Sequence, residues 1–92
     1  MKNIIWFKDN FEYYLNNYVI EYKFYENGDF GNLDQVEFNS TGKGGEIDFW
    51  SSGSLNIHFV NYITGQVLIN IFLEPYQEKE KNEIFERLRE LI

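Results

Sequence analysis

Hydrophobic positions in the first part of the chain follow one another in steps of three and four residues. They are Ile4, Phe7, Phe11, Leu15 and Tyr18. This spacing is the period of an amphipathic helix. The pattern predicts a helix from Asn3 to about Asn17, where Asn tolerates the left-handed conformation that ends many helices.

From Tyr18 to Tyr25 the period changes to two, and aromatic and β-branched residues predominate, which predicts a strand. Four similar segments follow, separated by turns rich in Gly, Ser, Asn and Thr. The predicted strands are 18–25, 33–40, 45–51, 55–62 and 66–74, and the predicted turns are 27–32, 41–44, 52–54 and 63–65. Strand 66–74 is nearly all apolar, which is typical of a central strand or of one that is covered on both faces.

The helical period returns after Pro75. The apolar positions of this last segment are Ile84, Phe85, Leu88, Leu91 and Ile92. They form one stripe on an otherwise charged segment, so we expect a C-terminal helix. The 92 residues suffice for one domain, 1–92. The predicted fold is α+β, a five-stranded antiparallel meander sheet with an N-terminal and a C-terminal helix.

The parity of the apolar residues predicts which side chains share a face, because side chains alternate along a strand. Turns of four residues at 41–44 and of three residues at 52–54 and 63–65 keep the apolar sets together. Gly65 would then take the left-handed position of its turn. The predicted buried rows are Ile20, Phe38, Ile47, Phe59 and Ile69, beside Tyr22, Val36, Phe49, Ile57 and Ile71. We expect the two helices to cover them.

The same register assigns the opposite face. Its predicted rows are Glu21, Glu37, Asp48, His58 and Asn70, then Lys23, Gln35, Trp50, Asn56 and Phe72, then Val19, Asn39, Glu46, Val60 and Leu68. Three carboxylates, Glu21, Glu37 and Asp48, would lie side by side, and like charges directly opposite destabilise a sheet. Such a face is either fully exposed to water or uses its negative electrostatic field.

Aromatic residues within a polar rim are typical of a binding hot spot. We therefore take the second face as a candidate protein-binding surface. Its candidate residues are Glu21, Glu37, Glu46, Asp48, Trp50, His58 and Phe72. In the alternative interpretation one helix packs on this face, so that Trp50, Phe72 and Leu68 belong to the core.

Composition and charge narrow the class of partner. Aromatic residues make up 20% of the chain, too many for a disordered segment. The formal net charge of -7 opposes binding to nucleic acid or to an anionic membrane. It favours a basic protein partner, although acidity can also serve solubility alone. The lack of cysteine and the short apolar run near the N-terminus, typical of neither a signal peptide nor a membrane span, predict a cytoplasmic protein.

No residue pattern indicates catalysis. The single histidine, His58, could be a general base beside Asp48, but the nearby serines lie in the turn that contains Ser52 and no activated nucleophile accompanies them. A flat row of carboxylates does not converge on one metal ion, and Gly42–Gly45 lacks the spacing of a phosphate-binding loop. We therefore predict no enzymatic activity, no cofactor and no metal.

The stretch 42–62, GKGGEIDFWSSGSLNIHFVNY, followed by Thr64-Gly65 and LINIFLEP, resembles segments of immunity proteins from bacterial contact-dependent growth inhibition and polymorphic toxin systems. The resemblance implies a non-enzymatic, stoichiometric inhibitor that binds a cognate toxin domain, commonly a nuclease with a basic cleft. It assigns no individual residue, because such proteins share no common functional positions. The alternative is a small homo-oligomeric structural or adaptor domain that uses Trp50 and Phe72.

Overall fold

The computed structural model describes residues 2–92 and contains two helices, a short 3₁₀ helix and five strands. The helical segments are α1 (Ile4–Asn10), η1 (Glu12–Leu15) and α2 (Glu78–Leu91), and the strands are β1 (Val19–Gly28), β2 (Gly31–Asn39), β3 (Lys43–Trp50), β4 (Leu55–Asn61) and β5 (Val67–Leu73). The strands form one antiparallel sheet in the order β1-β2-β3-β4-β5. The predicted α+β meander is confirmed. Within residues 2–92, no helix combines the length and apolar character needed to cross a membrane.

The N-terminal helical segment is shorter than the predicted 3–17. Asn3 caps α1, because its side-chain oxygen accepts a hydrogen bond of 2.9 Å from the backbone N–H of Trp6. The helix ends at Phe11, whose φ of -123° is not helical, and continues only as η1. Asn, Tyr and Phe are weak helix formers, so packing rather than propensity holds this segment together.

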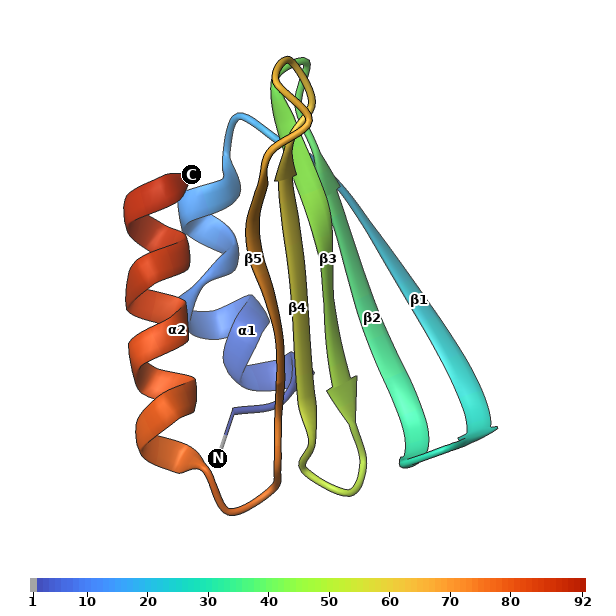
Figure 1. Cartoon of the computed structure of the whole chain (residues 1–92). Coiled ribbons are helices and arrows are strands. Elements are labelled where there is room, and N and C mark those ends of the chain that lie inside the picture. The colour runs from blue at the N-terminus through green and yellow to red at the C-terminus, as the bar shows by residue number, and fades with distance from the viewer. Residues whose placement is uncertain (1) are drawn as a thin grey trace.

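Both α1 and α2 pack on the same face of the sheet (Figure 1). We call this the covered face and the other the open face. The ring of Phe49 in β3 lies 5.9 Å from that of Phe7 and 6.2 Å from that of Phe85, centroid to centroid. Phe85 of α2 also contacts Phe11 at 5.2 Å. The alternative in which one helix packs on the second face is therefore wrong.

The predicted faces of β2, β3 and β4 are correct, but their pairing is shifted by two residues. Phe38 lies opposite Gly45 rather than Ile47, and Gly45 lies opposite Phe59. Because Gly45 has no side chain, the rings of Phe38 and Phe59 meet across it with centroids 5.5 Å apart. A side chain at this position would separate the two rings, which explains the register.

The shift by two residues arises from the length and position of the turns. A two-residue turn, Thr41-Gly42, replaces the predicted four-residue turn and is closed by a hydrogen bond of 2.8 Å from the Ser40 N–H to the Lys43 carbonyl. The next turn has the predicted three residues but lies one position earlier, since the Trp50 N–H donates to the Ser54 carbonyl. Each change moves the pairing by an even number of residues, so every side chain keeps its face.

The start of β5 departs from the predicted alternation. A four-residue turn, 62–65, replaces the predicted three-residue turn and is closed by a hydrogen bond of 2.9 Å from the Asn61 N–H to the Gln66 carbonyl. Gly65 has a φ of 76°, the left-handed conformation expected for it. The register then shifts between Phe59 and Val60, so that Val60 pairs with Val67. Leu68 consequently packs against the main core, and its predicted place on the second face is wrong.

The hairpin of β1 and β2 is longer than predicted, because only Asp29 and Phe30 separate the two strands. The ends of these strands extend beyond the helical layer (Figure 1). Tyr22, predicted to be buried, packs against Phe7 of α1 with ring centroids 6.4 Å apart but is 37% exposed. The nearly all-apolar strand β5 lies at the edge of the sheet opposite β1, as the predicted meander requires, so its composition does not reflect a central position.

Candidate functional site

The open face carries a row of side chains that runs across all five strands. Cross-strand pairing places Glu21 opposite Glu37, Glu37 opposite Glu46, Glu46 opposite His58, and His58 opposite Asn70. The third carboxylate of the row is thus Glu46, not the predicted Asp48, because of the shift by two residues.

Asp48 nevertheless stays close to this row, because a glutamine side chain links it to Glu46. The amide of Gln35 donates hydrogen bonds to Glu46 at 2.7 Å and to Asp48 at 2.9 Å. We call Glu21, Glu37, Glu46 and Asp48 the acidic cluster. All four are predicted site residues, and the structure brings them together on β1, β2 and β3.

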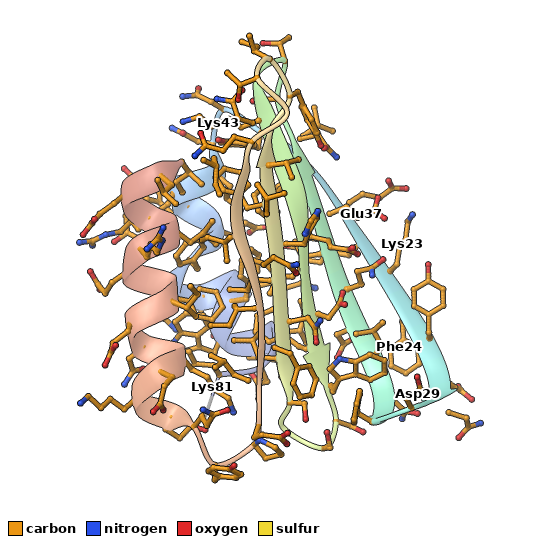
Figure 2. All side chains as sticks on the ribbon, viewed as in Figure 1. Lys23, Phe24, Asp29, Glu37, Lys43 and Lys81 are labelled. Carbon is orange, nitrogen blue, oxygen red and sulfur yellow. The ribbon has the colours of Figure 1, made fainter. Side chains whose placement is uncertain are left out.

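The negative charge of the acidic cluster is only partly compensated. Lys23 forms an ion pair with Glu37 at 2.9 Å, and both side chains project from the open face (Figure 2). Burial raises the pKa of Glu46, and the charges of Asp48 and Glu37 raise it further. Burial also raises the pKa of Asp48, against the opposing effect of the Gln35 hydrogen bond. Both carboxylates are therefore less stable as anions than they would be in water.

His58 lies beside the cluster rather than in a catalytic arrangement. Its cross-strand neighbour is Glu46, whereas Asp48 faces Asn56, so the predicted pairing of Asp48 with His58 is wrong. A shallow hollow here is lined by Glu37, Asn39, Gly45, Glu46, His58 and Tyr62. Among residues 2–92, no three His, Asp or Glu side chains are placed to hold a metal ion together.

Aromatic residues form a second feature on the open face, toward the end where the β1–β2 hairpin turns. We call Phe30, Leu33, Trp50 and Phe72 the aromatic cluster. The ring of Phe30 lies 5.4 Å from that of Trp50 and 5.1 Å from that of Phe72. Leu33 lies opposite Trp50 and is only 8% exposed. The two predicted aromatic residues, Trp50 and Phe72, are thus joined through Phe30.

Close packing supports Trp50 from several sides. Its ring lies over Gly28, where an added Cβ would stand 2.7 Å from the ring and would force the ring to move. The turn of Phe30 is tied to the β3–β4 turn, since the Ser52 N–H donates to the Phe30 carbonyl at 3.3 Å. Trp50 is therefore partly covered, and the rings available to a partner are those of Phe30, 43% exposed, and Phe72, 36% exposed.

Three residues of this surface are not among the sequence candidates. Phe30 lies in the predicted turn 27–32, and the pattern along the chain indicates neither the burial of Leu33 nor the bridge formed by Gln35. Leu33 and Gln35 are odd-numbered like Glu37, so the alternation of side chains along the strand predicts that both lie on this face. No sequence signal predicted that the turn folds back so that Phe30 covers Trp50.

A scan against known protein families finds no match for this chain, and no curated protein matches it.

Proposed function

We propose that this chain is a non-enzymatic immunity protein that binds a basic surface of a toxin domain through its open face. The observation that carries the proposal is the acidic cluster, which lies on the sheet face opposite the one that α1 and α2 cover. An extended sheet presents these side chains in a fixed arrangement, which lowers the entropy lost on binding.

The electrostatics of the acidic cluster suit a cationic partner. Glu37 and Glu46 lie directly opposite each other, which destabilises the free sheet. An Arg or Lys of a partner would relieve this repulsion and favour the charged forms of Glu46 and Asp48, whose pKa values are raised in the free chain. The overall charge of -7 would also speed the encounter with a basic protein. An active-site cleft that binds a nucleic acid backbone is a surface of this kind.

The aromatic cluster supplies apolar contact area beside the charges. Phe30 and Phe72 are partly exposed rings that stand on the buried Leu33 and the partly covered Trp50. Rigid aromatic anchors of this kind contribute strongly to binding when a partner excludes water from them. We therefore expect steering by the acidic cluster and retention by the aromatic cluster.

The alternative function, a homo-oligomeric structural or adaptor domain, would use the same exposed rings. A face-to-face contact of two copies would bring two acidic clusters near each other, which like-charge repulsion opposes. We therefore favour a basic heterologous partner over self-association through the open face.

Binding to the protein encoded immediately upstream tests the proposal, since a toxin gene directly precedes its immunity gene. Titration calorimetry at low and high salt would compare the natural chain with Glu37→Lys/Glu46→Lys. We expect the variant to bind about tenfold or more weakly at low salt and to lose most of the salt dependence.

A matched control carries the same change of charge on the helical side of the molecule, as Asp9→Lys/Glu90→Lys. Both control residues are exposed, so it should keep most of its affinity. Equal loss in the two variants would reduce the effect to net charge and would remove the open face from the interface.

A further inference from the structure

The outer edge formed by β5 lacks the protection that edge strands normally carry. Such strands are kept from pairing with other chains by charged residues, proline or bulges along their length. The other edge strand, β1, contains Glu21, Lys23 and Glu26 and has an irregular register after Tyr25. From Val67 to Leu73, in contrast, β5 has no charged residue and no proline, and its irregularity is confined to its first residues.

The backbone of β5 offers free hydrogen-bonding groups at this edge. The Asn61 N–H donates to the Gln66 carbonyl, so the odd-numbered residues of β4 direct their peptide groups toward β5. Their partners are Leu73, Ile71 and Ile69. Because peptide groups alternate in direction along a strand, those of Asn70 and Phe72 point outward. Within residues 2–92, β4 is the only strand that pairs with β5.

Two adjoining hollows run between β5 and α2 on the covered side of this edge. They are lined by Leu68, Ile69, Asn70, Ile71, Leu73, Glu80, Glu83, Ile84 and Arg87. Their floor is apolar and their rim carries charges of both signs. The lining is thus suited to an incoming extended segment with apolar side chains at alternate positions.

We propose that a second copy of this chain docks here, with its β5 antiparallel to the first β5 and the two-fold axis at Asn70. The strand is self-complementary about this residue. Asn70 would meet Asn70 of the second copy, while Ile69 and Ile71 would each face the other across the axis. On α2, Glu83 and Arg87 give each copy one acidic and one basic group beside the axis, so the two rims are complementary in charge.

The resulting assembly would be one continuous sheet of ten strands. A two-fold axis perpendicular to the sheet places both pairs of helices on the same side. Both open faces therefore remain free, and the acidic cluster of each copy stays available. The inference goes beyond the proposed function and does not depend on it.

Charged residues placed at the two-fold axis, at position 70, test the proposed dimer. Asn70 is exposed, so Asn70→Lys and Asn70→Asp should both fold. Each variant alone would bring two like charges together, and we expect self-association about tenfold or more weaker than in the natural chain. An equimolar mixture of the two variants should associate again, because Lys then faces Asp. Sedimentation equilibrium from micromolar to millimolar concentrations measures all three samples.

Two further variants complete the test. Asn70→Pro removes an outward N–H but no hydrogen bond between β4 and β5. The variant should therefore keep its fold and be a monomer. Val19→Lys, on the other edge strand, should leave self-association unchanged. A natural chain that stays monomeric at millimolar concentration, or a dimer that survives in Asn70→Pro, would overturn the proposal, as would a mixture of Lys and Asp variants that remains monomeric.

Salt separates this proposal from the proposed function. Each copy carries a charge of -7, so screening should strengthen self-association. The same screening should weaken binding to a basic toxin. Failure of one effect therefore leaves the other measurable.

Discussion

On the covered face, Phe38 and Phe59 have no exposed surface and their rings meet across Gly45. On the open face, one residue further along β3, Glu46 lies opposite Glu37, and its pKa is raised by burial and by neighbouring carboxylates. Close packing on the covered face thus stabilises the fold, whereas the neighbouring carboxylates on the open face destabilise it. Residues that reduce stability without a structural benefit are typical of functional surfaces. This contrast is the reason for assigning binding to the open face.

The largest effect is expected where the covered face is packed most tightly. In Gly45→Ala the new Cβ would stand 1.8 Å from the His58 carbonyl oxygen, and this neighbouring backbone cannot move without breaking the ladder. We expect a loss of about 3 kcal/mol or more in the free energy of unfolding, measured by urea denaturation. The control is Gly42→Ala, whose Cβ would meet only the Ile63 side chain at 3.7 Å. Equal stabilities of these two variants would contradict the packing argument.

An intermediate effect is expected at Lys81, the buried cation that holds α2 to the end of the sheet (Figure 2). Its ammonium group donates hydrogen bonds to the carbonyls of Gly53 at 2.7 Å and Pro75 at 3.0 Å. Lys81→Met would leave both carbonyls without this donor, so we expect a loss of about 2 kcal/mol. Thermal unfolding would measure it. Lys79→Met, at a largely exposed position of the same helix, should change stability by less than about 0.5 kcal/mol.

The smallest effect is expected on the open face, and its sign is opposite. Glu46→Gln removes like-charge repulsion and should increase the free energy of unfolding by about 0.2–1 kcal/mol at neutral pH. In the natural chain the raised pKa values of Glu46 and Asp48 mean that the folded state binds protons more readily than the unfolded state. The destabilisation by these groups is therefore complete above their raised pKa values and disappears as pH falls toward their ordinary values.

The difference between Glu46→Gln and the natural chain should accordingly shrink on acidification, which denaturation at a series of pH values would show. Glu80→Gln, on the exposed side of α2, serves as the control and should show little change. A destabilised Glu46→Gln variant would indicate that the Gln35 bridge outweighs the repulsion, and the contrast between the two faces would then be weaker.

Several features were predictable from the sequence because they depend on local periodicity. Parity placed Glu37, Glu46 and Trp50 on one face and Phe49 on the other. In the apolar stripe near the C-terminus, Ile84, Phe85 and Leu88 are buried, and Leu91 and Ile92 are partly buried. The pairings of β1 with β2 and of β4 with β5 are as predicted, apart from the start of β5. The register of β3 against β2 and β4 was not predictable in this way, since a shift by two residues leaves every face unchanged. Gly45 decided it, because the sheet gains more from contact between the rings of Phe38 and Phe59 than from the predicted pairing with Ile47.

The sequence by itself determined the order of the elements, the side of the sheet on which each side chain of the regular strands lies, and the concentration of negative charge on one of those sides. These properties follow from spacing and parity along single segments. Only the tertiary structure decided that both helices share one face, that Glu46 completes the acidic row, and that Phe30 covers Trp50. Each of these depends on contacts between segments far apart in the chain, and their free energies are set by packing rather than by the period of any one segment.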